Sequence, residues 1–285
     1  MFRGKIRPRW DRLSRAFTPH IAGIAPPLTS AMASIQSKLK SMKPLTNQVA
    51  LVTGGTRGIG RAITKMLLTQ GTAVAICGRR EEDVTRAANE LRAETGGKVK
   101  GKAADVRNYE EVAKLFQFVD AEFGGLDVLV NNAGVGVLRP VAELSIEDWK
   151  RTIETNLHGA FYCSREALFR LGTRGGGYIV NIGSLAGTNA FAGGAAYNAS
   201  KFGLTGFTEA MMQDVRSQNV RVSYVMPGSV ATGFGGAAAE SDKSDHGSDW
   251  KVWPEDVAEI VRMLLLMPAR TLISRVEVRP ARPKR

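Results

Sequence analysis

The chain has 285 residues, of which 44% are hydrophobic and 31 are glycine, and its formal net charge is +12 at pH 7. This composition is typical of a globular protein and argues against intrinsic disorder. Its apolar runs fall well short of the roughly 18 residues that a membrane-spanning helix needs, and its few cysteines and histidines show no metal-ligand spacing, so neither a membrane span nor a metal site is expected.

The first 41 residues differ in charge from the rest of the chain. They contain eight basic residues and one acidic residue, so +7 of the net charge of +12 lies in residues 1–41. A segment rich in Arg and Ser and poor in acidic residues indicates an unstructured leader, which is either an organelle transit peptide or upstream sequence read as coding before Met42. Nucleic-acid binding would depend on this arm alone and is not expected. We expect a leader over residues 1–41, a domain over residues 42–285 and a cytoplasmic location, or a mitochondrion or plastid if the leader is a transit peptide.

From residue 48 onward, apolar runs alternate with amphipathic helical patterns. The runs expected to form buried strands are residues 49–52, 73–76, 99–104, 126–130, 178–182, 220–225 and 272–278. The helices expected between them cover residues 59–70, 84–91, 112–119, 145–171, 195–217 and 254–266. This alternation predicts a single doubly wound α/β domain, with a seven-stranded parallel sheet covered by helices on both faces. The long irregular segment over residues 233–249 is expected to be a functional or mobile loop.

A glycine-rich turn separates the first predicted strand from the first predicted helix. It reads Thr53-Gly54-Gly55-Thr56-Arg57-Gly58-Ile59-Gly60. Glycines at this place allow a tight turn and let the backbone approach a diphosphate, whose charge is stabilised by the helix N-terminus. The spacing differs from the Gly-x-Gly-x-x-Gly of the commonest dinucleotide fold and lacks the Gly-Lys-Ser/Thr end of a Walker loop. A dinucleotide site is therefore expected here, and a plain strand-to-helix turn is the alternative.

Tyr197 and Lys201 are four residues apart in the predicted helix over residues 195–217. This spacing places a phenol and an ammonium group on one helix face, one turn apart. A cation beside a phenol lowers the pKa of the phenol, which allows proton exchange with a substrate at cellular pH. Ser184, 13 residues before Tyr197, ends a strand at the sheet edge where ligands bind in open α/β folds. Its hydroxyl is expected to donate to a substrate carbonyl, and capping of the following turn is the alternative.

In this order, these motifs resemble those of the short-chain dehydrogenase/reductase family, in its compact single-domain branch. The resemblance extends over residues 43–280. It includes four further segments: Asp105-Val106, Asn131-Asn132-Ala133-Gly134, Thr155-Asn156-Leu157, and Pro227-Gly228 with Thr232. The resemblance implies four catalytic residues: Asn156, Ser184, Tyr197 and Lys201. It further implies that Asn156 holds a water in a relay from Lys201 to solvent, with a purely structural role as the alternative.

The same resemblance implies a set of residues that bind a nicotinamide dinucleotide. Asp105 would accept from the adenine amino group, unless it merely caps the strand end. Residues 131–134 would stabilise the central strand and border the adenosine ribose, and Thr232 with the backbone of Val230 would contact the carboxamide. The expected cofactor-binding residues are Gly54, Thr56, Arg57, Gly58, Ile59, Gly60, Arg79, Asp105, Val106, Asn131, Ala133, Gly134, Tyr197, Lys201, Pro227, Gly228, Val230 and Thr232.

The choice of cofactor follows from charge. NAD-specific enzymes place an acidic residue after the second strand, where it accepts the ribose 2′-hydroxyl. Here that corner reads Cys77-Gly78-Arg79-Arg80, with no carboxylate before Glu81. Arg79, together with Arg57 in the glycine turn, suits charge-assisted recognition of a 2′-phosphate. We therefore expect NADP(H) in preference to NAD(H), although an arginine at this corner could instead only face solvent beside Glu81.

The resemblance implies an oxidoreductase that reversibly reduces a ketone or aldehyde to an alcohol by hydride transfer from NADPH, with Tyr197 as the acid–base group. The segments through Tyr197 are similar to 3-oxoacyl-carrier-protein reductases, but residues 272–280 lack the Gly-Gly close of those enzymes. Reduction of 3-oxoacyl thioesters is therefore the alternative. An NADP-binding regulatory or scaffold protein without activity is the alternative of another class, and the complete catalytic set argues against it. Members of this family usually pair through long helices, so a homodimer or homotetramer with a small-molecule substrate is expected.

Overall fold

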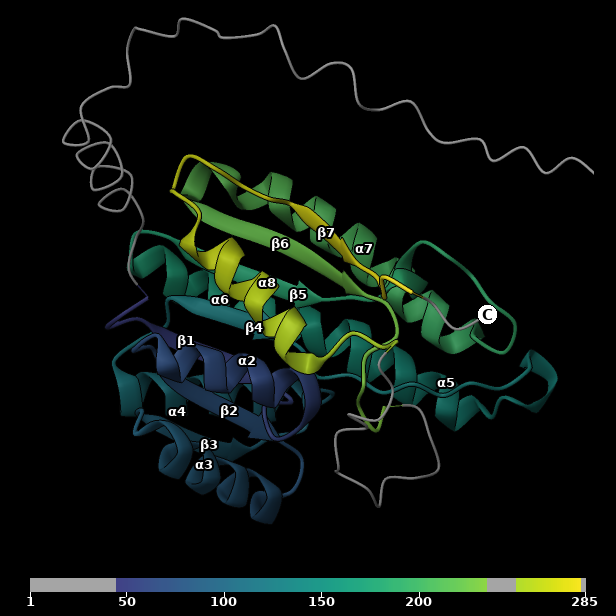
Figure 1. Ribbon diagram of the computed structural model, residues 1–285, viewed down its shortest axis with the longest axis horizontal. Coiled ribbons are helices and arrows are strands. Elements are labelled where there is room, and N and C mark those ends of the chain that lie inside the picture. Colours follow the sequence, from purple (N-terminus) through teal and green to yellow (C-terminus); the bar gives the residue numbers. More distant parts are fainter. Residues whose placement is uncertain (1–44, 235–249, 283–285) are drawn as a thin grey trace, which may run out of the picture. The chain divides into compact units, whose positions relative to one another are not determined.

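The computed structural model describes residues 45–234 and 250–282, which Figure 1 draws as coloured ribbon. The strands are β1 (Val49–Thr53), β2 (Ala73–Gly78), β3 (Val99–Ala103), β4 (Val128–Asn131), β5 (Gly177–Ile182), β6 (Val220–Pro227) and β7 (Arg275–Val278). The longer helices are α2 (Gly58–Thr69), α3 (Glu81–Thr95), α4 (Tyr109–Phe123), α5 (Ile146–Ile153), α6 (Gly159–Thr173), α7 (Ala195–Val215) and α8 (Pro254–Leu266). The predicted leader and nearly all of the predicted loop over residues 233–249 lie outside the described residues, and the proposed domain division stays a prediction.

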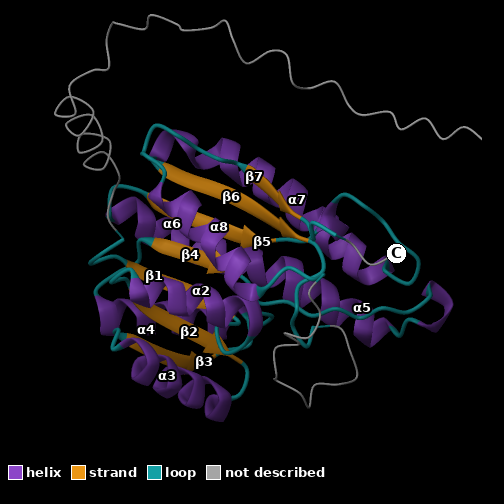
Figure 2. Cartoon of the chain, viewed as in Figure 1, coloured by secondary structure: helices purple, strands orange, loops and turns teal. Residues whose placement is uncertain are grey.

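The sheet has seven strands in the order β3-β2-β1-β4-β5-β6-β7, and every neighbouring pair is parallel (Figure 2). The predicted doubly wound parallel sheet is thus confirmed. The chain builds outward from β1 toward β3, then returns to the centre and builds outward from β4 toward β7. This reversal opens a crevice beyond the carboxyl ends of β1 and β4, which is where ligands bind in open α/β sheets.

Two apolar layers hold the sheet. Helices α2, α3 and α8 pack on one face through side chains such as Leu67 and Val261, and α4, α6 and α7 pack on the other through Leu115 and Leu171. All four of these side chains are fully buried. Burying one leucine stabilises the fold by about 1.5–3 kcal/mol, so the layers keep the carboxyl edge of the sheet in a fixed shape.

Local signals set where several helices begin and end. Asn108 and Ser145 precede α4 and α5, and each accepts a hydrogen bond from a backbone N–H of the first helical turn. Such caps satisfy N–H groups that have no partner inside the helix. Gly96 and Gly124 end α3 and α4 with positive φ angles of 66° and 78°, a conformation that glycine adopts without strain.

A π-helical turn, η2 (Glu154–His158), interrupts the helix that was expected without a break over residues 145–171. The backbone N–H of Gly159 donates to the carbonyl of Glu154, five residues back, and not to the usual partner four residues back. The expectation of one continuous α-helix is therefore wrong at its centre. Single π turns occur frequently at functional sites, and this one contains Asn156.

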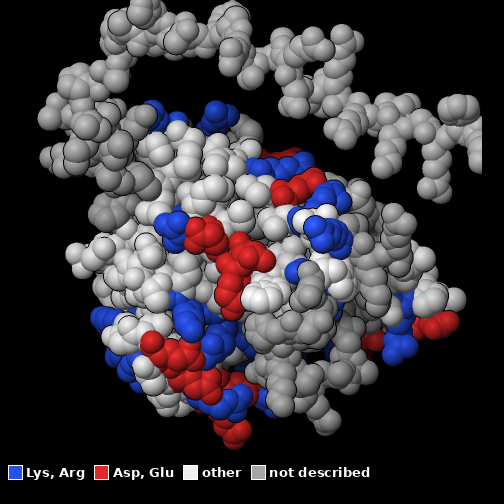
Figure 3. All heavy atoms as spheres, in the orientation of Figure 1, with Lys and Arg blue, Asp and Glu red and all other residues white. Residues whose placement is uncertain are grey.

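The surface seen in Figure 3 carries basic and acidic side chains interspersed with one another. Two ion pairs, from Arg61 to Glu90 (3.3 Å) and from Lys65 to Glu94 (2.9 Å), join α2 to α3 on such a mixed surface. Exposed pairs of this kind contribute about 0–1 kcal/mol each. Within the described ranges, every helix falls short of the length and apolarity needed to traverse a bilayer.

Candidate functional site

The structure gathers the predicted site residues at the carboxyl edge of the sheet. The glycine-turn residues follow β1 and begin α2, Arg79 follows β2, Asp105 and Val106 follow β3, Asn131 ends β4 before Ala133 and Gly134, and Pro227 ends β6 before Gly228, Val230 and Thr232. Ser184 follows β5, Tyr197 and Lys201 lie on α7, and Asn156 lies in the π turn. Segments up to 180 residues apart in the sequence thus share one edge, because parallel strands all end there.

The glycine turn leaves room for a group that lies against its backbone. Gly54 has a φ of +63°, and a Cβ on Gly60 would lie 2.2 Å from the carbonyl oxygen of Gly54. Arg57, the residue before α2, makes no side-chain hydrogen bond to the helix, so the first backbone N–H groups of α2 are uncapped. Uncapped donors at a helix N-terminus attract anions. The residues present therefore fit the diphosphate of a dinucleotide.

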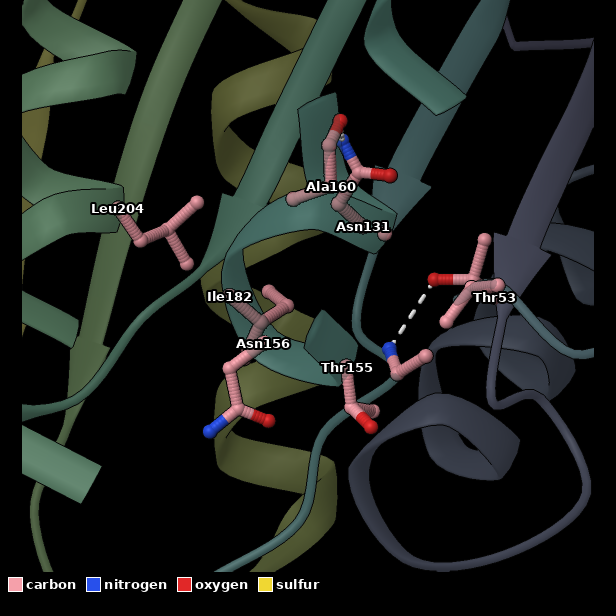
Figure 4. Close-up of a pocket in the computed structure, with 10 residues that line it drawn as sticks. Thr53, Asn131, Thr155, Asn156, Ala160, Ile182 and Leu204 are labelled. Atoms are coloured by element: carbon pink, nitrogen blue, oxygen red, sulfur yellow. Dashed lines mark hydrogen bonds between the residues drawn. The ribbon is translucent and has the colours of Figure 1, made fainter. Parts of the chain in front are cut away.

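Thr53 and Asn132 hold the glycine turn against the loop after β4. Thr53 Oγ1 accepts hydrogen bonds from the backbone N–H groups of Asn132 and Ala133, both at 3.0 Å, and Figure 4 draws the second of them. Asn132 Nδ2 donates to the carbonyls of Thr53 (3.0 Å) and Gly54 (3.1 Å). Asn132 was expected only as part of the segment 131–134 that borders the adenosine ribose. Its bonds to the glycine turn were not predicted, because these partners lie nearly 80 residues upstream in the sequence.

The two arginines expected to meet a 2′-phosphate are exposed at the ends of β1 and β2. Neither Arg57 nor Arg79 forms an ion pair within residues 45–234 and 250–282, whereas Arg80 is paired with Asp83 on α3. The alternative that an arginine at this corner only faces solvent stays open for Arg79, since both arginines are exposed. Arg79 keeps its guanidinium available for an anion.

Asp105, the expected partner of adenine, is held by a residue that sequence analysis did not single out. Arg107 Nε lies 3.0 Å from both carboxylate oxygens of Asp105, and its Nη2 lies 2.6 Å from Oδ2. The pKa of Asp105 is lowered, chiefly by these hydrogen bonds and in smaller part by the charge of Arg79. The carboxylate is therefore ionised and already accepts several donors, and its role toward adenine stays a prediction.

Tyr197, Lys201 and Ser184 meet where α7 crosses the end of β5. The Ser184 side chain approaches the Tyr197 phenol closely enough to lower its pKa. Lys201 Nζ lies 5.8 Å from the centre of the Tyr197 ring and donates to the carbonyl of Ile182 at 3.1 Å. Ser184 Oγ also accepts from the backbone N–H of Ala186 at 3.1 Å, so the hydroxyl caps the turn after β5 as well as facing the phenol.

Burial changes the protonation of this group. The pKa of Tyr197 is raised above its ordinary value because burial disfavours the phenolate, and the nearby Ser184 side chain offsets only part of this. Burial also lowers the pKa of Lys201 to about 8. The expectation that a neighbouring cation lowers the pKa of Tyr197 is therefore wrong for the protein chain alone, because the same dry surroundings disfavour both charges.

The lowered pKa of Lys201 predicts a dependence of stability on pH. In the unfolded chain, Lys201 keeps its proton up to its ordinary pKa of 10.5, whereas in the folded chain Lys201 loses this proton near pH 8. The unfolded state therefore binds more protons between these values, and the free energy of unfolding rises with pH. Urea unfolding at pH 8 and pH 10 should show that Lys201→Met removes about 2 kcal/mol of this rise. An unchanged pH dependence in the variant would contradict a buried Lys201.

Asn156 uses its whole amide within the protein. Its Oδ1 accepts from the backbone N–H of Val135 (2.8 Å), and its Nδ2 donates to the carbonyl of Val135 (2.9 Å) and to Ser200 Oγ (3.0 Å). Asn156 therefore ties the loop after β4 to α7, one residue before Lys201. Ser200 was missed by sequence analysis, and the implied role of Asn156 in a water relay stays a prediction.

A small cavity lies beneath this site (Figure 4). Its volume is about 10 Å³, and its lining includes Thr53, Asn131, Thr155, Asn156 and Ile182. Asn131 Nδ2 donates to Ser164 Oγ (2.9 Å) and Asn181 Oδ1 (2.8 Å), while its Oδ1 has no donor in the described part of the chain. The cavity is far too small for an organic substrate, and Asn131 ties β4 to β5 and α6 as the expected stabiliser of the central strand.

The segment after β6 faces the glycine turn and Tyr197. The methyl group of Thr232 lies 3.3 Å from where a Cβ on Gly58 would be. The ring of Phe234 is 5.7 Å from the ring of Tyr197, centre to centre, and packs on Gly136. Phe234 is a further residue that sequence analysis missed, since only the fold brings residues 136, 197 and 234 together. It gives the open side of Tyr197 an apolar wall.

Comparisons with known proteins agree with this geometry. A family model described as short chain dehydrogenase matches residues 48–243. The chain is 35% identical over 238 residues to an NADP-dependent 3-hydroxy acid dehydrogenase of Escherichia coli, covering 81% of this chain and 94% of that protein. It is also similar to the crystal structure of a metagenomic short-chain oxidoreductase in complex with NADP (35% identity, TM-score 0.72, 85% of this chain and 100% of that chain). A structure of actinorhodin polyketide ketoreductase with NADPH is similar as well (35% identity, TM-score 0.74, 82% of this chain and 96% of that chain).

Proposed function

This chain belongs to the short-chain dehydrogenase/reductase family, and on that premise we propose that it reduces a ketone or aldehyde to an alcohol with NADPH, in a reversible reaction. The observation that carries this proposal is the meeting of Ser184, Tyr197 and Lys201 beside the glycine turn at one edge of the sheet. A scaffold protein without activity has no need for a phenol, a hydroxyl and a buried ammonium in one place.

NADP(H) is favoured over NAD(H) by the charges around the site. Arg57 and Arg79 offer two exposed guanidiniums without an ion pair in the described residues, and no carboxylate lies between β2 and Glu81. Guanidinium groups bind phosphate through charge-assisted hydrogen bonds. The names of a relative and of two similar structures, which are NADP-dependent or contain NADP or NADPH, support the same choice.

Each catalytic side chain has a role that its surroundings suit. A bound NADPH supplies the hydride that reduces the carbonyl carbon. Ser184 holds the carbonyl oxygen by a hydrogen bond, and Tyr197 donates its phenolic proton to that oxygen as negative charge develops there. The raised pKa of Tyr197 keeps its phenol protonated at neutral pH, which suits the direction of reduction. Lys201, still largely protonated at neutral pH with a pKa of about 8, stabilises the phenolate that Tyr197 leaves behind.

The substrate is best matched by a carbonyl compound with an apolar substituent. Phe234 covers one side of Tyr197, and its ring is the apolar surface that such a substituent would contact. Reduction of 3-oxoacyl thioesters is the second candidate, because the similar structures include a polyketide ketoreductase. Both candidate reactions would use the same catalytic groups of this chain, and they differ in the chain attached to the carbonyl.

The test is the oxidation of NADPH and of NADH, followed by absorbance, with a panel of aryl and alkyl ketones, aldehydes and 3-oxoacyl thioesters. Turnover of free ketones with NADPH supports the first candidate, and turnover restricted to thioesters supports the second. If NADPH binds but no member of the panel is reduced, the proposal of an enzyme is wrong and a regulatory role takes its place.

We also propose that the protein is a homodimer or homotetramer that pairs through α6 and α7. Phe161 and Phe169 on α6 and Phe202 on α7 are exposed, and large aromatic side chains are enriched at interfaces between subunits. Contiguous exposed apolar surface of this kind marks an interaction site. Sedimentation equilibrium of the full chain tests this assignment, and a monomer at micromolar concentration would contradict it.

A further inference from the structure

Tyr224, in the middle of β6, lies at the junction between the two elements that carry the catalytic groups. Its side chain is only 2% exposed, and its hydroxyl donates to the carbonyl of Lys201 at 3.2 Å. The backbone of Ser184 and the side chain of Thr205 lie near enough to this hydroxyl to lower its pKa, although burial raises that pKa by more. One phenol therefore touches both the turn after β5 and helix α7.

The chain leaves space for this ring at the residue just before Ser184. A Cβ on Gly183 would lie 2.1 Å from the Cζ atom and 2.3 Å from the hydroxyl oxygen of Tyr224. Real Cβ atoms do not approach other atoms so closely, so the Tyr224 ring fits here only because residue 183 is a glycine. The end of β5 rests directly on the tyrosine ring.

The turn after Ser184 encloses the hydroxyl from the other side. A Cβ on Gly187 would lie 2.8 Å from the Tyr224 hydroxyl and 3.0 Å from the carbonyl of Lys201. Thr205 Oγ1 lies 2.9 Å from that same carbonyl and 3.3 Å from the carbonyl of Gly187. The hydroxyl thus sits in a closed polar junction, and its distance from each neighbour is set by packing.

We propose that Tyr224 is a positioning residue that sets the separation between Ser184 and the Tyr197–Lys201 pair. The inference rests on the proposed function, because it assigns Tyr224 a role in the chemistry of those three groups. Tyr197 is one helical turn before Lys201. A ring that packs on Gly183 and bonds the Lys201 carbonyl therefore also fixes the distance between Ser184 and the phenol that it must meet. A misplacement of about 1 Å between catalytic groups lowers a rate by about a hundredfold. Loss of the Tyr224 contacts should therefore lower kcat.

The opposing explanation is that Tyr224 is an ordinary core tyrosine. The chain offers a matched control, because Tyr178 on β5 is also 2% exposed and also has a bonded hydroxyl, 2.7 Å from Ser223 Oγ. Tyr178 is near the amino end of β5, at the opposite edge of the sheet from Ser184. Tyr178→Phe therefore removes a buried hydroxyl of the same kind without touching the catalytic junction.

The experiment compares Tyr224→Phe with Tyr178→Phe in NADPH-dependent reduction of a ketone that the wild-type chain reduces. Tyr224→Phe should lower kcat by about tenfold, with the Kd for NADPH within about twofold of wild type. The nearby Ser184 side chain lowers the pKa of Tyr197, so a larger separation of the two residues should move the alkaline limb of the kcat profile upward by about half a pH unit. Tyr178→Phe should leave kcat and that limb unchanged.

A second variant keeps the test decisive if Tyr224→Phe does not fold. Thr205→Val keeps the shape of its side chain and removes the hydroxyl that donates to the Lys201 carbonyl, the same carbonyl to which Tyr224 donates. It should shift the alkaline limb in the same direction with a smaller loss of kcat. The inference is overturned if the variants that fold keep the wild-type kcat and alkaline limb, or if Tyr178→Phe changes both as much as they do. A wild-type chain that reduces no carbonyl would instead overturn the proposed function, so the two failures are distinguishable.

Discussion

Tyr197→Phe should lower kcat for carbonyl reduction by about 10³-fold while the affinity for NADPH stays within about threefold, because general acid catalysis contributes about 10²–10⁴-fold and the lost hydroxyl is expected to act on the substrate. The variant keeps the ring that packs near Phe234, so the fold should be retained. Stopped-flow or steady-state oxidation of NADPH measures kcat, and fluorescence titration measures the affinity for the cofactor.

Tyr109→Phe is the matched control for this substitution. Tyr109 also has a bonded hydroxyl, 2.7 Å from Glu166, but it is exposed at the start of α4 and belongs to no part of the candidate site. Its replacement should leave kcat within about twofold of wild type, since surface substitutions away from a site change little. If Tyr197→Phe retained turnover close to that of Tyr109→Phe, the assignment of Tyr197 as the acid would be refuted.

Arg79→Ala should weaken NADPH binding by about 10–100-fold and leave NADH binding unchanged. A hydrogen bond to a charged group contributes about 1.5–3 kcal/mol, and only NADPH carries the 2′-phosphate that this guanidinium is expected to meet. Arg79 is exposed and free of ion pairs in the described ranges, so its loss costs the fold little. Isothermal titration with each cofactor at fixed ionic strength measures the change.

The neighbouring arginine provides the control for this prediction. Arg80 has the same charge but is bound to Asp83, so Arg80→Ala should change the affinity for NADPH by less than about threefold. Equal losses in the two variants would mean that the cofactor senses only the net charge of this corner. A loss of NADH binding in Arg79→Ala that matched the loss of NADPH binding would contradict recognition of the phosphate.

Much of the fold could be predicted from local sequence. The helix predicted over residues 254–266 has the same bounds as α8, and six of the strands both begin and end within two residues of prediction. Apolar periodicity, together with proline at the start of α8 and glycines at the ends of α3 and α4, sets these bounds through the immediate neighbours of each residue. The π turn at Asn156 could not be predicted, because it depends on hydrogen bonds to Val135 and Ser200, which lie on other segments.

The candidate site, like the fold, could be predicted from the sequence only in part. Its motifs and their spacing marked Ser184, Tyr197 and Lys201, and the structure brings these residues together. Ser200 and Tyr224, which anchor the helix that carries Tyr197 and Lys201, had no local signal, because each one acts through partners on distant segments. The pKa of Tyr197 went against expectation for the same reason, since burial depends on everything that packs around the phenol.

The sequence by itself determined the alternation of strands and helices, the family resemblance and the types of side chain at the carboxyl edge of the sheet. These features follow from the spacing of residues along the chain, since helical and extended periods place side chains on one face or the other. The tertiary structure alone sets which buried groups keep their charge, which arginines lack an ion pair, and which tyrosine packs between Ser184 and Lys201. Those properties depend on the approach of segments far apart in the sequence, because desolvation and hydrogen bonding are set by neighbours in space.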